Sequence, residues 1–203
     1  MSQQEQFEKF FPPDFTIETL RVIIRSMKPG DFDAFVPLTT KSPELWKYFT
    51  KDLSIASELK DWVNEAMKEK SEFKRMPFTI IDRDTKEICG STSFGNLSFY
   101  DKRVEIGWSW LAADYIGMGV NMAVKFALMS FAFEVMKMER VEAKTDFLNE
   151  RAKAGLLKIG MKPEGVLRSH MQMPGNRRRD SAYYALLKDE WKERKELFFS
   201  HLI

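Results

Sequence analysis

Hydrophobic and polar residues follow one another along this chain with two different periods. Alternation with a period of two, or a short apolar run, predicts strands, and such segments cover residues 20–25, 78–81, 87–94, 101–111, 140–146, 166–171 and 181–187. Apolar residues three or four positions apart predict amphipathic helices, and these cover residues 32–36, the stretches that start near 43 and 57, and residues 119–138, 149–159 and 189–199. The predicted order is β-α-α-(α)-β-β-β-α-β-α-β-β, closed by a helix.

The junction between the third strand of the central meander and the longest predicted helix is the most distinctive feature. A short turn with two glycines joins them. The first N–H groups of a helix lack partners and carry the positive end of its dipole, so such a turn binds phosphate groups without a lysine. Glycine permits close backbone approach and positive φ. The predicted phosphate-binding backbone comprises Ile116, Gly117, Met118, Gly119, Val120 and Asn121. In a dinucleotide-binding fold this turn follows the first strand, whereas here a meander precedes it.

Composition narrows the class of protein further. A chain of 203 residues with 44% hydrophobic and 31% charged residues suits one soluble domain, and its net charge of +2 requires neither nucleic acid nor membrane as partner. We find no apolar run long enough to span a bilayer and no signal-peptide core at the N-terminus. One cysteine and two histidines exclude an internal disulfide and disfavour a metal site. We therefore expect a cytoplasmic protein, with an N-terminal arm at 1–18 and a single domain at 19–203.

Several motifs occur in a fixed order, each in the expected secondary structure. They are Arg21-Val22-Ile23-Ile24-Arg25 with Pro29-Gly30-Asp31, Glu105-Ile106-Gly107-Trp108, Gly117-Met118-Gly119, Asn149-Glu150-Arg151-Ala152, the 160–171 segment and the 180–191 segment. Over roughly residues 19 to 191, this series resembles the GNAT-superfamily acetyltransferases, specifically the RimJ/RimL-type N-acetyltransferase group. The resemblance implies an α+β fold, in which a mixed sheet of about seven strands has helices on both faces and a splayed strand pair at the cofactor site.

The resemblance also implies acetyl-CoA as cofactor, with CoA as product. The glycine turn then holds the pyrophosphate, and the strand end at Trp110 and Leu111 offers unpaired backbone groups to the pantetheine arm. Asn149 contacts the same arm, caps the following helix, or does both. One position departs from the family, which often has Gln or Arg where this chain has Asp114.

The implied reaction moves an acetyl group to an amine, which needs a base, an oxyanion donor and a proton for the thiolate. We predict Glu105 as the base, since simple alternation places it with Gly107 and Ser109, opposite Trp108 and Trp110. The alternative is a structural carboxylate paired with an arginine such as Arg103 or Arg140. His170 is the second candidate base, and the backbone N–H near Leu111 is the predicted oxyanion donor. The family's frequent thiolate-protonating tyrosine or serine is missing, so water, Tyr183 or Tyr184 takes its place.

Acceptor recognition is less determined by the residues. Trp46 and Tyr48, with Phe49, form an aromatic cluster that lines the acceptor cleft or belongs to the core. The basic run Arg177–Arg179 attracts an acidic group or is simply a solvated turn. We predict acetylation of a primary amine, most readily a protein N-terminus. The alternatives are a small amine such as a polyamine or aminoglycoside, and a non-catalytic acyl-CoA-binding regulatory domain. Aromatic residues near the C-terminus leave a homodimer open.

Overall fold

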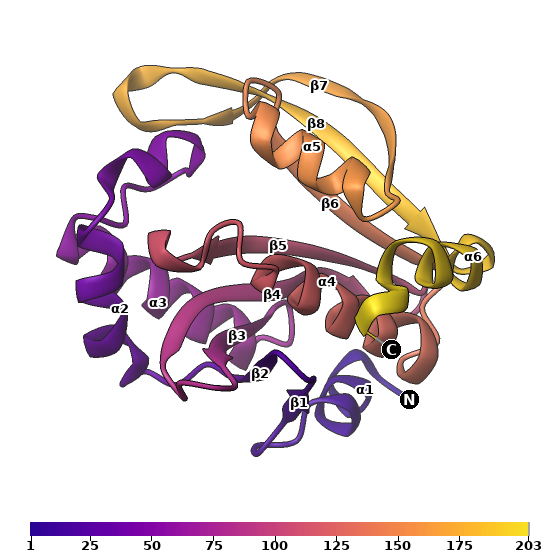
Figure 1. Cartoon of the computed structure of the whole chain (residues 1–203). Coiled ribbons are helices and arrows are strands. Elements are labelled where there is room, and N and C mark those ends of the chain that lie inside the picture. Colours follow the sequence, from indigo (N-terminus) through magenta and orange to yellow (C-terminus); the bar gives the residue numbers. More distant parts are fainter. Residues whose placement is uncertain (203) are drawn as a thin grey trace.

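A single mixed sheet organises the computed structural model, which describes residues 1–202. Its strand order is β1-β2-β3-β4-β5-β6-β8-β7 (Figure 1). The strands are β1 (Thr16–Glu18), β2 (Val22–Ser26), β3 (Met76–Asp82), β4 (Ile88–Ser98), β5 (Arg103–Leu111), β6 (Arg140–Asp146), β7 (Lys162–Gln172) and β8 (Arg178–Leu187). The predicted strands are all present, and β1 adds an eighth strand that is too short and too polar to show a period of two.

The helices are α1 (Gln3–Phe10), α2 (Asp31–Thr40), α3 (Ala56–Ser71), α4 (Val120–Ser130), α5 (Glu150–Lys158) and α6 (Lys188–Phe199). Shorter helical turns lie at Pro43–Tyr48 (η1), Ala113–Tyr115 (η2), Phe131–Val135 (η3), Pro174–Asn176 (η4) and Ser200–Leu202 (η5). The helix predicted over 119–138 ends earlier, because η3 is a π-helical turn that continues α4 only to Val135. None of the helices among residues 1–202 is long and apolar enough to cross a membrane.

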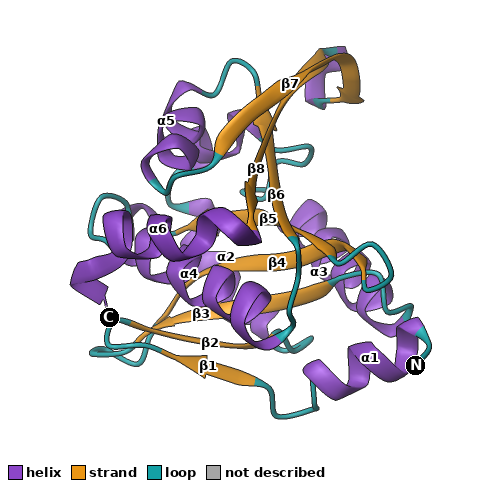
Figure 2. Ribbon diagram, turned by 90° about the vertical axis from the view of Figure 1, so that its right-hand side faces the viewer, coloured by secondary structure: helices purple, strands orange, loops and turns teal. Residues whose placement is uncertain are grey.

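Helices cover both faces of the sheet (Figure 2). Each face has its own apolar core. On one face, α4 packs on β2 to β5 with the N-terminal arm beside it. Phe7, Phe11 and Phe15 of that arm are buried there, and the Phe11 ring contacts those of Phe78, Phe94 and Phe131. On the other face, α2, η1 and α3 enclose a smaller core that contains Trp46, Trp62 and Trp110. The expected arrangement of helices on both faces is confirmed.

The sheet splits between β5 and β6. These two strands pair in parallel only across Arg103–Arg140, Val104–Val141 and Glu105–Glu142. Beyond that point they diverge, and the sheet opens into one part with β1 to β5 and another with β6, β8 and β7 (Figure 1). The facing edges of β5 after Glu105 and of β6 after Glu142 therefore have no strand partner across this gap. We call this region, with edges at 106–111 and 143–146, the splay.

A β-bulge in β5 decides which side chains face which core. Ser93 pairs with Gly107 but Ser91 pairs with Trp110, so two residues of β5, Trp108 and Ser109, oppose the single residue between them in β4. Trp108 takes φ of +52°, and a Cβ at Gly95, the cross-strand partner of Glu105, would meet the Trp108 ring. The predicted placement of Trp108 and Trp110 opposite Glu105 is therefore wrong, because the extra residue reverses the alternation.

Candidate active site between β5 and β6

The glycine turn presents backbone N–H groups to open space. Gly117 and Gly119 have φ of +83° and +79°, and a Cβ built at either position meets nothing within 4 Å. Gly119 caps α4 with its backbone alone. Among the described residues, no acceptor receives a hydrogen bond from the backbone N–H groups of 117–122. The Ile116 N–H, in contrast, donates to the Ala113 carbonyl at 3.1 Å. The N–H groups of residues 117–122 can therefore donate to an anion such as a phosphate.

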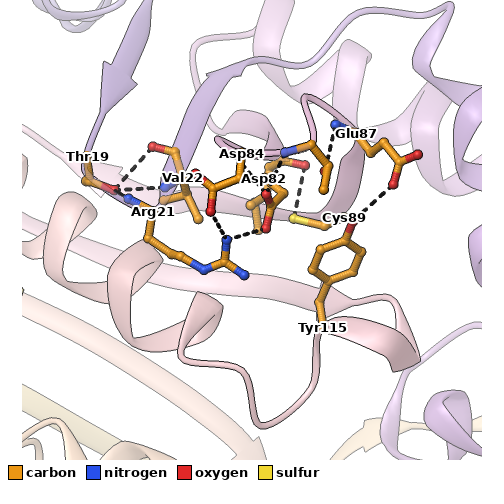
Figure 3. A network of polar contacts seen from close by, with 10 residues as sticks. Thr19, Arg21, Val22, Asp82, Asp84, Glu87, Cys89 and Tyr115 are labelled. Atoms are coloured by element: carbon orange, nitrogen blue, oxygen red, sulfur yellow. Dashed lines mark hydrogen bonds and ion pairs between the residues drawn. The ribbon is translucent and has the colours of Figure 1, made fainter.

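A polar network fixes the start of this turn (Figure 3). The Tyr115 hydroxyl donates to the Glu87 carboxylate at 3.3 Å, at the end of the β3–β4 hairpin. Asp82 holds that hairpin by accepting from the N–H groups of Asp84 and Thr85, and it pairs with Arg21 at 2.7 Å. Asp114 forms an ion pair with Lys41, with 2.5 Å between Oδ2 and Nζ, and both side chains are exposed.

The β5 edge of the splay carries backbone donors. The Ala112 N–H donates to the Cys89 carbonyl at 2.8 Å, towards β4. Because N–H directions alternate along a strand, the Leu111 N–H points to the opposite edge, where β6 has diverged. The Trp110 side chain is a core residue, with its ring against Phe35 and Trp46 at 5.2 and 5.7 Å between centroids. Only the backbone of this strand end faces the gap.

Asn149 lies at the start of α5, on the other side of the splay. Its Oδ1 accepts from the Ala152 N–H at 3.0 Å, which is the helix cap considered for this residue. No bond joins its Nδ2 to the described part of the chain. Capping and ligand contact therefore use different atoms of one side chain.

Glu105 lies at the closed end of the splay and is paired on both sides. Its Oε2 accepts from Lys144 Nζ at 2.8 Å and from Asn96 Nδ2 at 2.5 Å, and only 4% of the side chain is exposed. The predicted arginine partners are wrong. Arg140 binds Glu142 and Glu164, and Arg103 binds the Asn96 carbonyl.

The β6 to β8 side brings further polar groups beside Glu105. Lys144 Nζ lies 5.9 Å from the ring centroids of both Trp108 and Tyr183. The His170 ring packs edge-on against Tyr183 at 5.9 Å between centroids. A row of four side chains therefore runs from Glu105 through Lys144 and Tyr183 to His170. Lys144 could not be identified from the sequence, because nothing near a lysine in a strand indicates which residue of a neighbouring strand it will contact.

His170 faces the open end of this row. It belongs to a bulge in β7, where Ser169 has φ of +51° and its N–H donates to Asp180 at 2.6 Å. Its Nδ1 lies 3.0 Å from the Ser181 hydroxyl, and Ser181 pairs with Asp146, the last residue of β6. Partial burial, and then the charges of Lys144 and Arg179, lower the pKa of His170. The ring is therefore neutral near pH 7, as a base requires.

The two predicted catalytic groups of β5, the Glu105 carboxylate and the Leu111 N–H, lie far apart along the strand. Glu105 and Leu111 are six positions apart, which is about 15–20 Å in a strand. A group bound at the Leu111 N–H thus lies beyond the direct reach of the Glu105 carboxylate. The row that ends at His170 runs towards that end of the splay.

Trp46 and Tyr48 contribute differently to the mouth of the site. Trp46 is buried, and its Nε1 donates to the Thr39 carbonyl at 3.0 Å, so it is a core residue whose edge reaches the surface. It borders a hollow of about 190 Å³ with residues from the opposite β7–β8 hairpin, lined by Pro43, Trp46, Lys47, Asp52, Met173, Pro174 and Arg177. Tyr48 is half-buried beneath Lys47.

The basic run near this hollow is structural. Arg177 pairs with the buried Asp146 at 2.5 Å, Arg178 binds Ser169, and the buried Arg179 donates to Ser181 at 3.0 Å. The expectation of a solvated basic turn holds for Arg178, which is exposed, but not for Arg177, which binds the end of β6, or for the buried Arg179. Arg177 and Arg178 therefore restrain the β7–β8 hairpin, which carries His170.

Comparison with known proteins assigns this arrangement to a family. A family model described as "Acetyltransferase (GNAT) domain" matches residues 21–162. The chain is 26% identical over 178 residues to "Putative ribosomal N-acetyltransferase YdaF" of Bacillus subtilis, covering 86% of this chain and 95% of that protein.

Solved structures share the fold over nearly the whole chain. The crystal structure of a putative acetyltransferase from T. thermophilus has a TM-score of 0.82 and 26% identity, covering 93% of this chain and 97% of that one. "Mycobacterium smegmatis RimJ in complex with CoA-disulfide" has a TM-score of 0.76, with 21% identity over 91% of this chain and 95% of that one. The second likeness, at this identity, shows the fold.

Proposed function

Because the chain belongs to the GNAT family of acetyltransferases, we propose that it acetylates a protein N-terminal amine at the splay between β5 and β6. The observation that carries this proposal is the combination of unpaired amides at 117–122, the free β5 edge and the row from Glu105 to His170 in one gap. Acetyl-CoA, the acetyl donor of this family, supplies an activated thioester.

The chain offers separate groups for each part of such a ligand. The N–H groups of 117–122 and the N-terminus of α4 suit the pyrophosphate. The unpaired backbone of β5 suits the amides of the pantetheine arm, as an added strand would pair there. Asn149 Nδ2 is available to the same arm, and the Leu111 N–H suits the oxyanion.

Proton transfer falls to the row of polar side chains. His170 is neutral near pH 7 and faces the open end, so it suits removal of a proton from the acceptor ammonium. Glu105, which is bound to Lys144, suits a supporting role at the closed end. Tyr183, which lies in the row between Lys144 and His170, suits the return of a proton to the thiolate.

The hollow at the mouth of the site favours a peptide N-terminus over a small amine as the acceptor. The hollow at the mouth lies between η1 and the β7–β8 hairpin, and its lining mixes apolar, basic and acidic side chains. It thus suits the first side chains of a peptide. Two printed names are in keeping with this choice: one relative is a "Putative ribosomal N-acetyltransferase", and one structure is titled a "putative ribosomal-protein-serine acetyltransferase".

The test compares matched acceptors at equal concentration by release of the CoA thiol. One peptide has a free α-amine and no lysine. Its partner has a blocked N-terminus and one lysine, and a polyamine and an aminoglycoside complete the panel. We expect the first peptide to react at least about tenfold faster than the others, since one misplaced reacting group costs that much or more. Faster reaction of a small amine would contradict the acceptor assignment, and tight acetyl-CoA binding with no thiol release would favour a regulatory domain.

A further inference from the structure

Lys144 has no role in the proposed reaction, although its ammonium lies within the candidate site. Its Nζ is 2.8 Å from the Glu105 carboxylate, and the two side chains are 16% and 4% exposed. Removing such a pair from water is costly unless geometry and further hydrogen bonds compensate. Asn96 supplies one such bond to Glu105. Because burial of this ion pair is costly, we looked for a chemical role of Lys144.

The backbone of Lys144 borders the splay. The last residue of β6 that pairs with β5 is Glu142, and Lys144 follows two positions later. Its main chain thus faces the β5 edge that is free to hold the thioester. Lysine has a flexible four-carbon stem and three rotatable N–H donors, so its amine can turn from Glu105 towards that edge.

A carboxylate and two aromatic rings surround Lys144 Nζ, and such groups bind a primary ammonium. A carboxylate lies in hydrogen-bond contact, and the rings of Trp108 and Tyr183 lie at 5.9 Å on the same cation. Carboxylates and aromatic faces both attract a primary ammonium. A primary amine of this chain is therefore held at the closed end of the splay, beside a carboxylate that can take its proton.

We propose that Lys144 is a self-acetylation site, a proposal that rests on acetyl transfer at the splay. Glu105 takes one proton from the Lys144 ammonium. The nitrogen lone pair then forms a bond to the thioester carbonyl carbon, and the carbon–sulfur bond breaks with its electron pair on sulfur. The second proton lost from nitrogen ends on that sulfur. The products are Nε-acetyl-Lys144 and the CoA thiol, with Glu105 returning its proton to solvent.

The experiment incubates the full chain with acetyl-CoA and no acceptor, and follows acetylation of each lysine by peptide mass spectrometry. We expect Lys144 to gain an acetyl group at least about tenfold faster than Lys188, with a first-order rate that does not depend on protein concentration. Lys188 is the internal control, since it also pairs with a glutamate, Glu139 at 2.8 Å, but on the surface. This comparison needs no variant.

Three variants sharpen the test. Lys144→Arg should abolish the fast modification, and Lys188→Arg should leave it unchanged. Glu105→Gln should slow it at least about tenfold, as expected for loss of a base, while acetyl-CoA affinity stays within twofold (about 0.4 kcal/mol).

Failure of this proposal can be distinguished from failure of the proposed function. If the protein releases thiol with a peptide acceptor while Lys144 stays unmodified, self-acetylation is wrong and the function stands. Equal rates at Lys144 and Lys188, or a rate at Lys144 that rises with protein concentration, would also overturn it. Absence of both thiol release and modification would overturn both.

Discussion

At the scale of single residues, Lys125 carries a charge that its buried position disfavours. It lies on the buried face of α4, and its Nζ donates only to the Ser109 hydroxyl at 3.3 Å among the described residues. Burial lowers the pKa of Lys125 from 10.5 to about 8. The unfolded chain therefore binds more protons than the folded one between those values, so folding stability rises as the pH rises through this range.

This residue gives a prediction about stability. At about pH 7 the shift costs about 3 kcal/mol, and near pH 9.5 about 1 kcal/mol. Lys125→Met, which keeps the length of the side chain, should raise the free energy of unfolding in urea by up to those amounts. If Lys125→Met instead lowered the free energy of unfolding by the same amount at both pH values, this prediction would be wrong.

His170 gives a prediction about rate. Its pKa is lowered by burial, so activity should fall only as the pH drops below about 6.5, the ordinary value. His170→Gln should lower kcat/KM by about 10²–10⁴ and remove that acidic limb of the pH profile. An acidic limb that persists unchanged in the variant would show that another group is the base.

At the scale of elements, the glycine turn and α4 act as one unit. Gly119 has φ of +79°, so any side chain there strains the backbone. A side chain would also occupy the open space in front of the N–H groups, where we place the phosphate. Gly119→Val should weaken CoA binding at least about tenfold in calorimetry, at a stability cost of about 1–2 kcal/mol. The matched control is Gly30→Ala, since Gly30 also has open space but φ of −69°. Retained CoA affinity in Gly119→Val would place the phosphate elsewhere.

Periodicity predicted most strands and helices, because most of them have a clearly apolar face, although β7 is exposed along almost its whole length. It could not predict the bulge at Trp108, where a single extra residue exchanges the two faces of β5. The candidate site shows the same division. Glu105, His170 and the glycine turn could be identified because their chemistry is local. Lys144, Asn96 and the aromatic surroundings depend on where β5 meets β6 and β8, which no local pattern encodes.

At the scale of the whole molecule, the N-terminal arm completes the core. Phe11 is buried among rings from β3, β4 and η3. Phe11→Ala should lower the free energy of unfolding by about 3–5 kcal/mol. Phe10→Ala, a change at a partly buried ring stacked on Phe99, should cost clearly less. Equal, small effects would mean that the arm does not support the domain.

Among the described strands, backbone pairing joins the two parts of the sheet only between β5 and β6, and the site lies where these strands separate. The most direct test of this account mixes the protein with acetyl-CoA and the lysine-free peptide, and measures thiol release together with the mass of the peptide. We predict one thiol for each acetyl group found on the α-amine, and loss of both in Gly119→Val. Acetyl-CoA binding by the wild-type protein without any acetylated peptide or thiol above the protein-free rate would contradict it.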